Sequence, residues 1–152
     1  MKSLANRRDI AEIRQRLRQV RPDSPRRWGR MTAHQMICHA CDAFLMGTAA
    51  RPVSSVTGFH HRTIVKWMAL YGPVRWPQGI RTRPEIDQLI GGTRPTEFQM
   101  DVEALVALVE AIAAEPAFFR GRPHPIFGAL SEAAWRRWAY LHLDHHLRQF
   151  GA

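Results

Sequence analysis

Four stretches of the chain repeat apolar residues every three or four positions, a spacing that places them on one face of an α-helix. They predict helices over residues 7–20, from Thr32 to about Gly47, over 101–114, and from Ser131 almost to the C-terminus. Thr32 and Gln35 match a capping box, and Ser131 is a good N-cap residue. No stretch alternates apolar and polar residues as a strand does. We therefore expect an all-α fold in which four helices pack as a bundle.

The middle of the chain, residues 51–98, does not continue this pattern. A short helix is expected from Thr63 to Tyr71, and the prolines and glycines that follow interrupt any regular element. So much irregular chain is unusual in a small domain unless it covers something, such as the mouth of a site. We therefore expect an insertion with one short helix between the second and third bundle helices, its underside packed by Trp28, Trp67 and Trp76.

Two histidines one helical turn apart, His142 and His146, suggest metal chemistry on the last helix. At about 3.6 residues per turn they share a side with Trp138 and Gln149, the side expected to face the bundle, while Tyr140 falls on the other side. Burying two imidazoles without partners costs roughly 1–3 kcal/mol per polar group, and a shared divalent ion removes that cost. Side chains four positions apart lie about 5–6 Å apart at Cβ, so both rings can reach one ion. The alternative is two partly buried histidines bonded to carbonyls or water.

A metal ion needs at least one further protein ligand. The second helix offers four candidates, and their angular positions do not choose among them: His34, Cys38, His39 and Cys41. Far more residues separate the Cys-x-x-Cys pair from the histidine pair than in a zinc finger. Cys38 also lies inside the helix rather than at its N-terminus, which disfavours a thioredoxin-like role, so both cysteines are better interpreted as small core thiols. On the last helix, His145 lies at the edge of the buried face.

The 152-residue chain suits a single domain with one core, spanning residues 1–152. Its net charge is +9, but the cations are almost all arginines spread along the chain, with Lys2 and Lys66 as the only lysines. We interpret this charge as compositional, with an anionic substrate or surface as the minority alternative. The N-terminus does not resemble a signal peptide, and no apolar run reaches the roughly 20 residues that span a bilayer. We therefore expect a cytoplasmic protein without a membrane partner.

The last helix also resembles a known motif. Residues 141–150 are similar to the closing motif of the DinB-like (YfiT-like) metalloenzymes, in which a His-x-x-x-His helix usually ends in His-His-Arg-Gly-Gln. Arg148 stands here in place of the glycine that precedes the final Gln149. Two further stretches, 28–39 and 121–128, resemble one branch of this superfamily, a domain of unknown function. Together the similar stretches span most of the chain, and the middle segment is the least similar.

The resemblance implies a four-helix bundle of up-down-down-up topology and a metal site formed by His39, His142 and His146. It thereby selects His39 as the third ligand, which the periodicity leaves open. Three histidines would leave an open coordination position, as in catalytic zinc sites. Zinc is the first expectation for the divalent ion, with nickel or iron as alternatives. Characterised relatives are metal-dependent transferases or isomerases that use small cellular thiols.

We therefore expect a metal-dependent enzyme, a transferase or hydrolase, that activates a small thiol or water against a small electrophilic substrate. Gln149, His145 and Trp138 are expected beside the ligands. His124, between two prolines, is expected to brace a turn, with a place at the site mouth as the alternative. The alternative functions are a non-catalytic metal- or ligand-binding bundle and a nucleic-acid-binding helical domain, for which no motif is present. The expected partner is a small molecule, with a homodimer left open.

Overall fold

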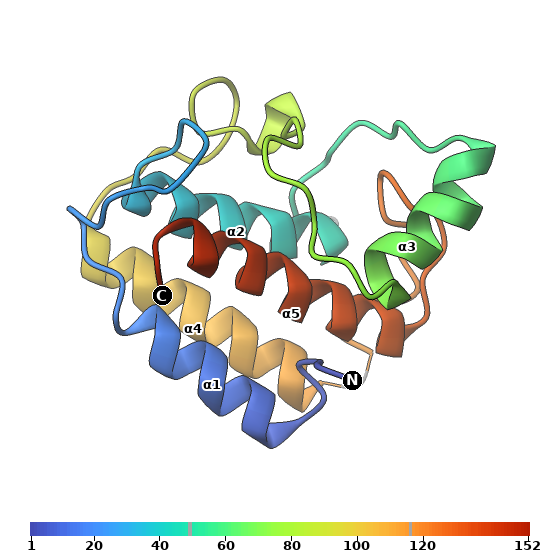
Figure 1. Ribbon diagram of the computed structural model, residues 1–152, viewed down its shortest axis with the longest axis horizontal. Helices are drawn as coiled ribbons and strands as arrows, with labels where there is room; N and C mark the ends of the chain where they lie inside the picture. Colours follow the sequence, from blue (N-terminus) through green and yellow to red (C-terminus); the bar gives the residue numbers. More distant parts are fainter. Residues whose placement is uncertain (49, 116) are drawn as a thin grey trace.

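The computed structural model describes residues 1–48, 50–115 and 117–152. Within these residues the protein is helical and has no β-strand; one isolated bridge joins His124 to Gly128. Figure 1 shows four long helices lying side by side. They are α1 (Arg7–Leu17), α2 (Ala33–Thr48), α4 (Phe98–Ala114) and α5 (Glu132–Gln149). The expected all-α class is thus confirmed.

Side-chain caps begin two of these helices where the sequence predicts them. The backbone amide of Gln35 donates to Thr32 Oγ1 (3.1 Å), and the amide of Thr32 donates to Gln35 Oε1 (2.9 Å). This reciprocal pair is a capping box, so that prediction is confirmed. At the start of α5, Ser131 Oγ accepts from the amide of Ala134 at 3.2 Å. Each cap satisfies an amide that has no partner inside its helix.

Two helix boundaries differ from the prediction. α4 begins at Phe98 rather than at Asp101, because the Glu97 carboxylate accepts from the backbone amides of the second and third helical residues. Glutamate is not a preferred N-cap residue, so the sequence gives little signal for this start. α1 ends at Leu17, although its apolar period continues to Val20. Val20 is nonetheless buried, from the turn that follows the helix.

The core lies between the long helices. α2 packs against α4, α1 packs against α4 and α5, and α5 also contacts α2. Every long helix contributes fully buried apolar side chains to this core, among them Ile13, Leu17, Ile37, Phe44, Leu105, Ile112, Trp135 and Leu143. No helix in the described part of the chain combines the length and the apolar character needed to cross a membrane.

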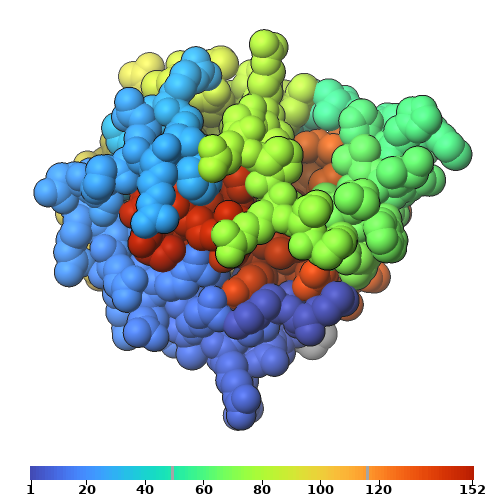
Figure 2. All heavy atoms as spheres, viewed as in Figure 1, coloured from blue at the N-terminus to red at the C-terminus, as the bar shows by residue number. Residues whose placement is uncertain are grey.

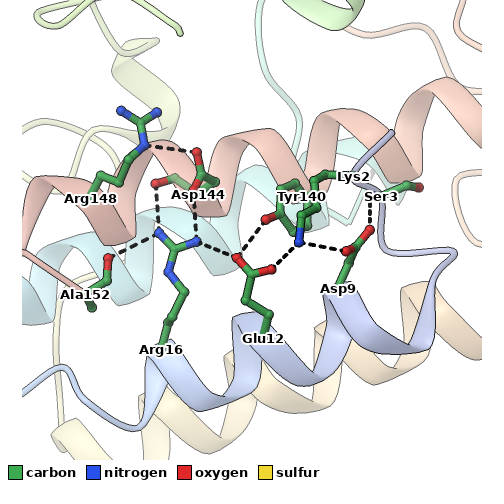
Figure 3. A network of polar contacts seen from close by, with 9 residues as sticks. All are labelled: Lys2, Ser3, Asp9, Glu12, Arg16, Tyr140, Asp144, Arg148 and Ala152. Atoms are coloured by element: carbon green, nitrogen blue, oxygen red, sulfur yellow. Dashed lines mark hydrogen bonds and ion pairs between the residues drawn. The ribbon is translucent and has the colours of Figure 1, made fainter.

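α5 is buried on more than one side because it has neighbours on several sides. Tyr140, which the helical period assigns to the outer side, is only 4% exposed and donates a hydrogen bond to Glu12 of α1 at 2.9 Å. Nearby, Arg16 of α1 pairs with Asp144 at 2.8 Å. Figure 3 shows this polar network running along α1 and α5. The expectation of an outward-facing Tyr140 is therefore wrong, since α1 covers it.

The middle segment contains three short helical elements: η1, a π-helical turn (His61–Val65), α3 (Lys66–Tyr71) and η2, a 3-10 turn (Pro84–Ile86). η1 and α3 together contain the short helix expected from residue 63 to 71, while η2 was not predicted. α3 packs against α5 at one end of the molecule (Figures 1 and 2). Trp67 is 57% exposed, so the expectation that it packs the underside is wrong. Trp28 and Trp76 are partly buried.

Asp42 of α2 fastens the later part of the middle segment to the bundle. Its carboxylate is 1% exposed and accepts from the Thr93 amide (2.8 Å), the Thr93 hydroxyl (2.7 Å) and the side-chain amide of Gln88 (2.8 Å). Arg51 pairs with the same carboxylate at 3.3 Å. A buried carboxylate is stable only when it is paired and hydrogen-bonded, so these contacts hold residues 88–93 against α2.

Candidate metal centre

Three buried histidines from two helices meet beneath the middle segment. His39 comes from α2, and His142 and His146 come from α5, one turn apart. One ring nitrogen of each lies within 4.8 Å of one ring nitrogen of both others. The ring centroids are 5.1 Å apart for His39 and His142, 4.8 Å for His39 and His146, and 4.7 Å for His142 and His146. The structure therefore brings together the three residues that the family resemblance selects.

Two of the three rings are held by hydrogen bonds at Nδ1. His39 Nδ1 lies 2.8 Å from the backbone oxygen of Ile86, which can only accept, so this nitrogen carries the proton. His146 Nδ1 lies 3.0 Å from Gln149 Oε1. The side-chain amide of Gln149 donates to the Trp28 oxygen at 2.8 Å, which fixes Oε1 as the acceptor for His146. In both rings the lone pair is thus left on Nε2.

His142 is held by packing rather than by a hydrogen bond. Its Nδ1 is buried and has no partner among the described residues. The ring stacks on Trp138, with centroids 4.9 Å apart and planes 21° apart. An unpaired polar atom in a buried position is destabilising, so a native structure that retains one calls for an explanation. A ligand bound at this nitrogen would provide it.

Burial keeps the three imidazoles neutral. It lowers the pKa of His142 and His146 well below 6.5, and the repulsion among the neighbouring rings lowers these pKa values further. The pKa of His39 is also lowered by burial, partly opposed by the bond to Ile86 and by the nearby carboxylates of Asp42 and Asp87. Neutral imidazole is the form that binds metal ions, so this site has three lone pairs available at neutral pH.

An apolar cavity of about 570 Å³ opens beside the three histidines. Its walls come from α2, α5, the middle segment and the turn 124–127, and include Ala43, Met46, Met68, Trp76, Phe127 and Trp138. Among the described residues that line it, none is Asp or Glu. This volume is typical of sites for small ligands, which are mostly apolar with a few polar groups. The expectation that the middle segment covers a site mouth agrees with this arrangement.

A second cavity, of about 560 Å³, is lined by one residue of the cluster, His146, and by the neighbouring His145. Its walls carry more polar groups, among them Arg30, Thr82, Asp87 and Gln149. His145 and His146 line both cavities, as do residues 80–82. Residues 80–82 therefore border two cavities of different polarity, and His146 is the residue of the cluster that both cavities share.

His145 and His124 lie close to the cluster but outside it. His145 is 7% exposed, and its ring lies between Trp28 (centroids 5.7 Å apart) and Trp76 (6.0 Å). His124 Nδ1 accepts from the amides of Ile126 (3.1 Å) and Phe127 (3.3 Å), so this ring braces its turn as expected. His124 also lines the apolar cavity. Both roles considered for it therefore agree with its position.

The other candidates on α2 form a separate group. His34, Cys38 and Asp101 place ligand atoms within 4.8 Å of one another. His34 Nε2 lies 2.7 Å from Asp101 Oδ2, and the Cys38 thiol donates to the same oxygen at 3.5 Å. Because these side chains satisfy one another, hydrogen bonding accounts for the group without an ion. Burial raises the pKa of Cys38 and of Cys41 to about 12, which agrees with unreactive core thiols.

Two groups that support the site, the Ile86 carbonyl and Asp42, and one residue of the separate group, Asp101, were absent from the sequence prediction. The Ile86 carbonyl is a backbone group and has no sequence signature. Asp101 precedes the apolar stripe of α4 as an ordinary first-turn acid. Asp42 did offer a signal, because it is a charged residue on a helix that is otherwise largely buried. A carboxylate in such a position needs buried partners, and here these hold the segment that contacts His39.

Comparison with known proteins adds a family but no activity. Residues 27–152 match the family described as "Protein of unknown function (DUF1569)". No curated protein and no solved structure matches the chain.

Proposed function

The chain belongs to the DUF1569 family, whose function is unknown, and from the chemistry of its buried site we propose that it is a metal-dependent enzyme. In this proposal His39, His142 and His146 hold a divalent ion, and the neighbouring cavity takes a small electrophilic substrate. The attacking group is a small thiol or water.

One observation carries the proposal: Nδ1 of two rings is held by a hydrogen bond that leaves the lone pair on Nε2, and the three rings each place one nitrogen within 4.8 Å of the others. A histidine that binds a metal almost always donates its other ring N–H to a carbonyl, carboxylate or water. His39 and His146 have this arrangement, through Ile86 and Gln149. The set therefore fits an ion in its ligand types, its protonation state and its supporting hydrogen bonds.

Zinc suits three imidazoles best, with nickel or iron as alternatives. When bound, the ion would supply a positive charge that lowers the pKa of a thiol or water beside it. Three protein ligands leave room for one exchangeable ligand, as in catalytic rather than structural zinc sites.

The remaining roles belong to the chain itself. The apolar walls exclude water from the reacting groups, which strengthens every electrostatic interaction there. Trp138 fixes the plane of His142 by stacking and borders the substrate cavity. Gln149 holds the proton of His146 on Nδ1. His145 faces both cavities and is placed to exchange a proton with a reactant in either one.

A DinB-like four-helix bundle is part of the same proposal. Its support is the direction of the long helices, since α1 and α5 run one way in Figure 1 while α2 and α4 run the other way. That order along the chain corresponds to the up-down-down-up topology. The cluster also takes two histidines from the last helix and one from the second, as the resemblance implies, and this distribution supports the proposed bundle as well.

Elemental analysis of protein purified without an affinity tag tests the metal site. We expect stoichiometric divalent metal in the wild type and little in His142→Ala. His60→Ala is the matched control, because His60 is exposed and does not line either cavity. A wild type without bound metal, or full occupancy in His142→Ala, would contradict the proposal.

A non-catalytic binding protein is the second candidate, favoured by the lack of a carboxylate among the described residues that line the apolar cavity. Its test uses cobalt-loaded protein with glutathione, mycothiol or bacillithiol, followed by an apolar epoxide such as styrene oxide. If the protein is an enzyme, one of the thiols changes the absorption spectrum of the bound cobalt, and the protein then consumes that thiol together with the epoxide. A passive binder leaves the uncatalysed rate unchanged.

A further inference from the structure

Most of the large apolar side chains exposed in the described residues gather in one segment, residues 56–80. Phe59 is 77% exposed, Ile64 64% and Trp67 57%. The same segment exposes Val56, Val65, Met68, Tyr71, Val74 and Ile80. It includes η1 and α3, which lie at one end of the molecule in Figures 1 and 2. Large exposed apolar side chains that gather in one place mark interaction sites, so a partner is expected here.

The segment is also uniformly basic. From residue 43 to residue 84 the chain has no Asp or Glu, while it contains Arg51, Arg62, Lys66, Arg75, Arg81 and Arg83. Within the described residues, Arg62, Lys66, Arg75 and Arg81 form no ion pair. Arg62, Arg75 and Arg81 are exposed. The partner should therefore combine an apolar interior with negative charge.

The inner side of the same segment forms a wall of the apolar cavity. Val56, Val65, Met68, Val74 and Ile80 line it. Val65 and Met68 are also about two-fifths exposed, at 40% and 39%. Val65 and Met68 therefore border both the cavity and the exposed apolar surface of the segment.

We propose that residues 56–80 bind the surface of an anionic lipid membrane. Phe59, Ile64 and Trp67 enter the interface, and Arg62 and Lys66 face the lipid phosphates. This is the composition of segments that lie in a membrane interface, with aromatic and aliphatic residues beside cations. Membrane binding does not depend on the metal centre. Only the consequence for the substrate, which then enters the cavity from the lipid phase, rests on the proposed function.

The charge pattern favours a lipid surface over two other partners. A symmetric dimer would place the same patch of both copies face to face, and cations would meet cations with no carboxylate of the segment to pair with them. A nucleic acid would be bound through its phosphates, and it gives no role to the exposed Phe59, Ile64 and Val74. An anionic bilayer accommodates both the cations and the apolar side chains.

Sedimentation of the full-length protein with vesicles tests the proposal. We expect binding to phosphatidylcholine vesicles that contain phosphatidylglycerol and little binding to phosphatidylcholine alone, with the bound fraction falling as salt is raised. Arg62→Glu combined with Lys66→Glu should weaken binding by at least roughly 30-fold at low salt, since each cation near such a surface contributes about five-fold. Ile64→Ser combined with Trp67→Ser should weaken it as well, and neither residue lines the cavity.

Leu89→Ser combined with Ile90→Ser is the matched control, because these residues are exposed apolar side chains outside the segment (52% and 70%). We expect this variant to sediment like the wild type, and circular dichroism checks that all variants are folded. Should one variant fail to fold, the other still tests the segment, since one removes its cations and the other its apolar side chains. Equal sedimentation with neutral and anionic vesicles, or none, overturns the proposal.

Two further measurements identify a different partner. Light scattering that finds a dimer, lost in the Ile64→Ser/Trp67→Ser variant, assigns the surface to a second copy and overturns the proposal. Retention of a DNA or RNA duplex at physiological salt, lost in the Arg62→Glu/Lys66→Glu variant, does the same. Metal content is measured independently on each variant, so failure of the membrane proposal and failure of the metal proposal remain distinguishable.

Discussion

Gln149 connects the histidine cluster to the loop that precedes α2. It accepts from His146 Nδ1 at 3.0 Å and donates to the Trp28 carbonyl at 2.8 Å, and the residue is 2% exposed. Its two bonds use opposite ends of one amide. A single side chain thereby fixes both the orientation and the proton of a ligand ring.

Replacing Gln149 by Leu should weaken metal binding by roughly 10–100-fold, because the acceptor that orients His146 is lost. A competition titration against a chelator measures this change. Gln149→Glu retains an acceptor oxygen and should stay within a few-fold of the wild type, although it loses the donor to Trp28. Wild-type affinity in Gln149→Leu would show that the ring needs no support from this side chain.

His124 should make the metal-free protein sensitive to acid. Burial lowers its pKa from 6.5 to about 3 in the folded state. The contribution of His124 to stability is therefore fully present above pH 6.5 and decreases as the pH falls toward 3. In this range the unfolded chain binds a proton on His124 and the folded chain does not. Between pH 7 and pH 5 this amounts to about 2 kcal/mol.

Urea denaturation at the two pH values, with a chelator present, measures this effect. His124→Asn retains an acceptor for the turn but cannot titrate, so its loss of stability between pH 7 and pH 5 should be smaller by about 2 kcal/mol. The other buried histidines contribute the same background to both proteins. An unchanged pH dependence in the variant would show that His124 becomes protonated in the folded state.

The residues of the site could be predicted only in part. His142 and His146 lie on one helix, so their spacing alone places them together. His39 could not be chosen from the period of α2, since the choice among its polar residues depends on how α2 is rotated against α5. The Ile86 carbonyl could not be foreseen at all, because it belongs to the irregular segment and acts through the backbone.

At the scale of elements, Asp42 positions the segment that contains Ile86. The Asp42-bound turn is joined to η2 because the Gly91 amide donates to the Pro84 oxygen at 3.0 Å. η2 also contacts α2 directly. The acceptor for His39 is therefore positioned by a chain of contacts that begins at a buried carboxylate.

Asp42→Ala should destabilise the protein by about 3–5 kcal/mol, because it leaves buried donors and the Arg51 charge without their partner. Urea denaturation measures this loss. Metal affinity should fall in the same variant, since the turn that orients His39 is released. Asp9→Ala is a control for loss of a buried carboxylate far from the site, as Asp9 lies on α1 and bonds the N-terminal segment. It should leave the metal affinity unchanged.

The helices themselves were more predictable than their surroundings. The capping box at Thr32 and the cap at Ser131 are local signals, and both helices begin where these residues predict. The outward assignment of Tyr140 is wrong because helical periodicity assumes one buried face, whereas α5 is covered on several sides. The fold of residues 51–98 could not be predicted, since it depends on tertiary partners such as Asp42.

For the whole molecule, a bound ion should stabilise the fold by mass action. An ion at about 100 times its dissociation constant adds roughly 2.7 kcal/mol when it binds only the folded state. In a domain of this size each kcal/mol raises Tm by about 2–4 °C, so a rise of roughly 5–10 °C is expected on adding zinc.

Differential scanning calorimetry of the chelator-treated protein, with and without zinc, measures this rise. His146→Ala should show little or none of it, while His60→Ala should respond like the wild type. An equal rise in His146→Ala would place the stabilising ion elsewhere on the protein.

At the scale of the whole molecule the net positive charge also has a different interpretation. Composition alone favours an arginine bias without function, because the cations are spread along the sequence. In the folded molecule the stretch without carboxylates coincides with the exposed apolar residues of 56–80. The overlap of the two stretches is visible in the sequence, but the exposure of the apolar side chains, which indicates a partner, is known only from the structure.

The bond from His39 to the Ile86 carbonyl has a thermodynamic consequence. Ile86 also lines the apolar cavity, so one short segment supports a ligand ring on one side and contacts the cavity contents on the other. A molecule that shifts this segment on binding must change the affinity for the ion, and the ion must change the affinity for that molecule by the same factor. If the histidines hold an ion as proposed, we therefore expect its affinity and that of the cavity ligand to be linked, and the two should be measured together.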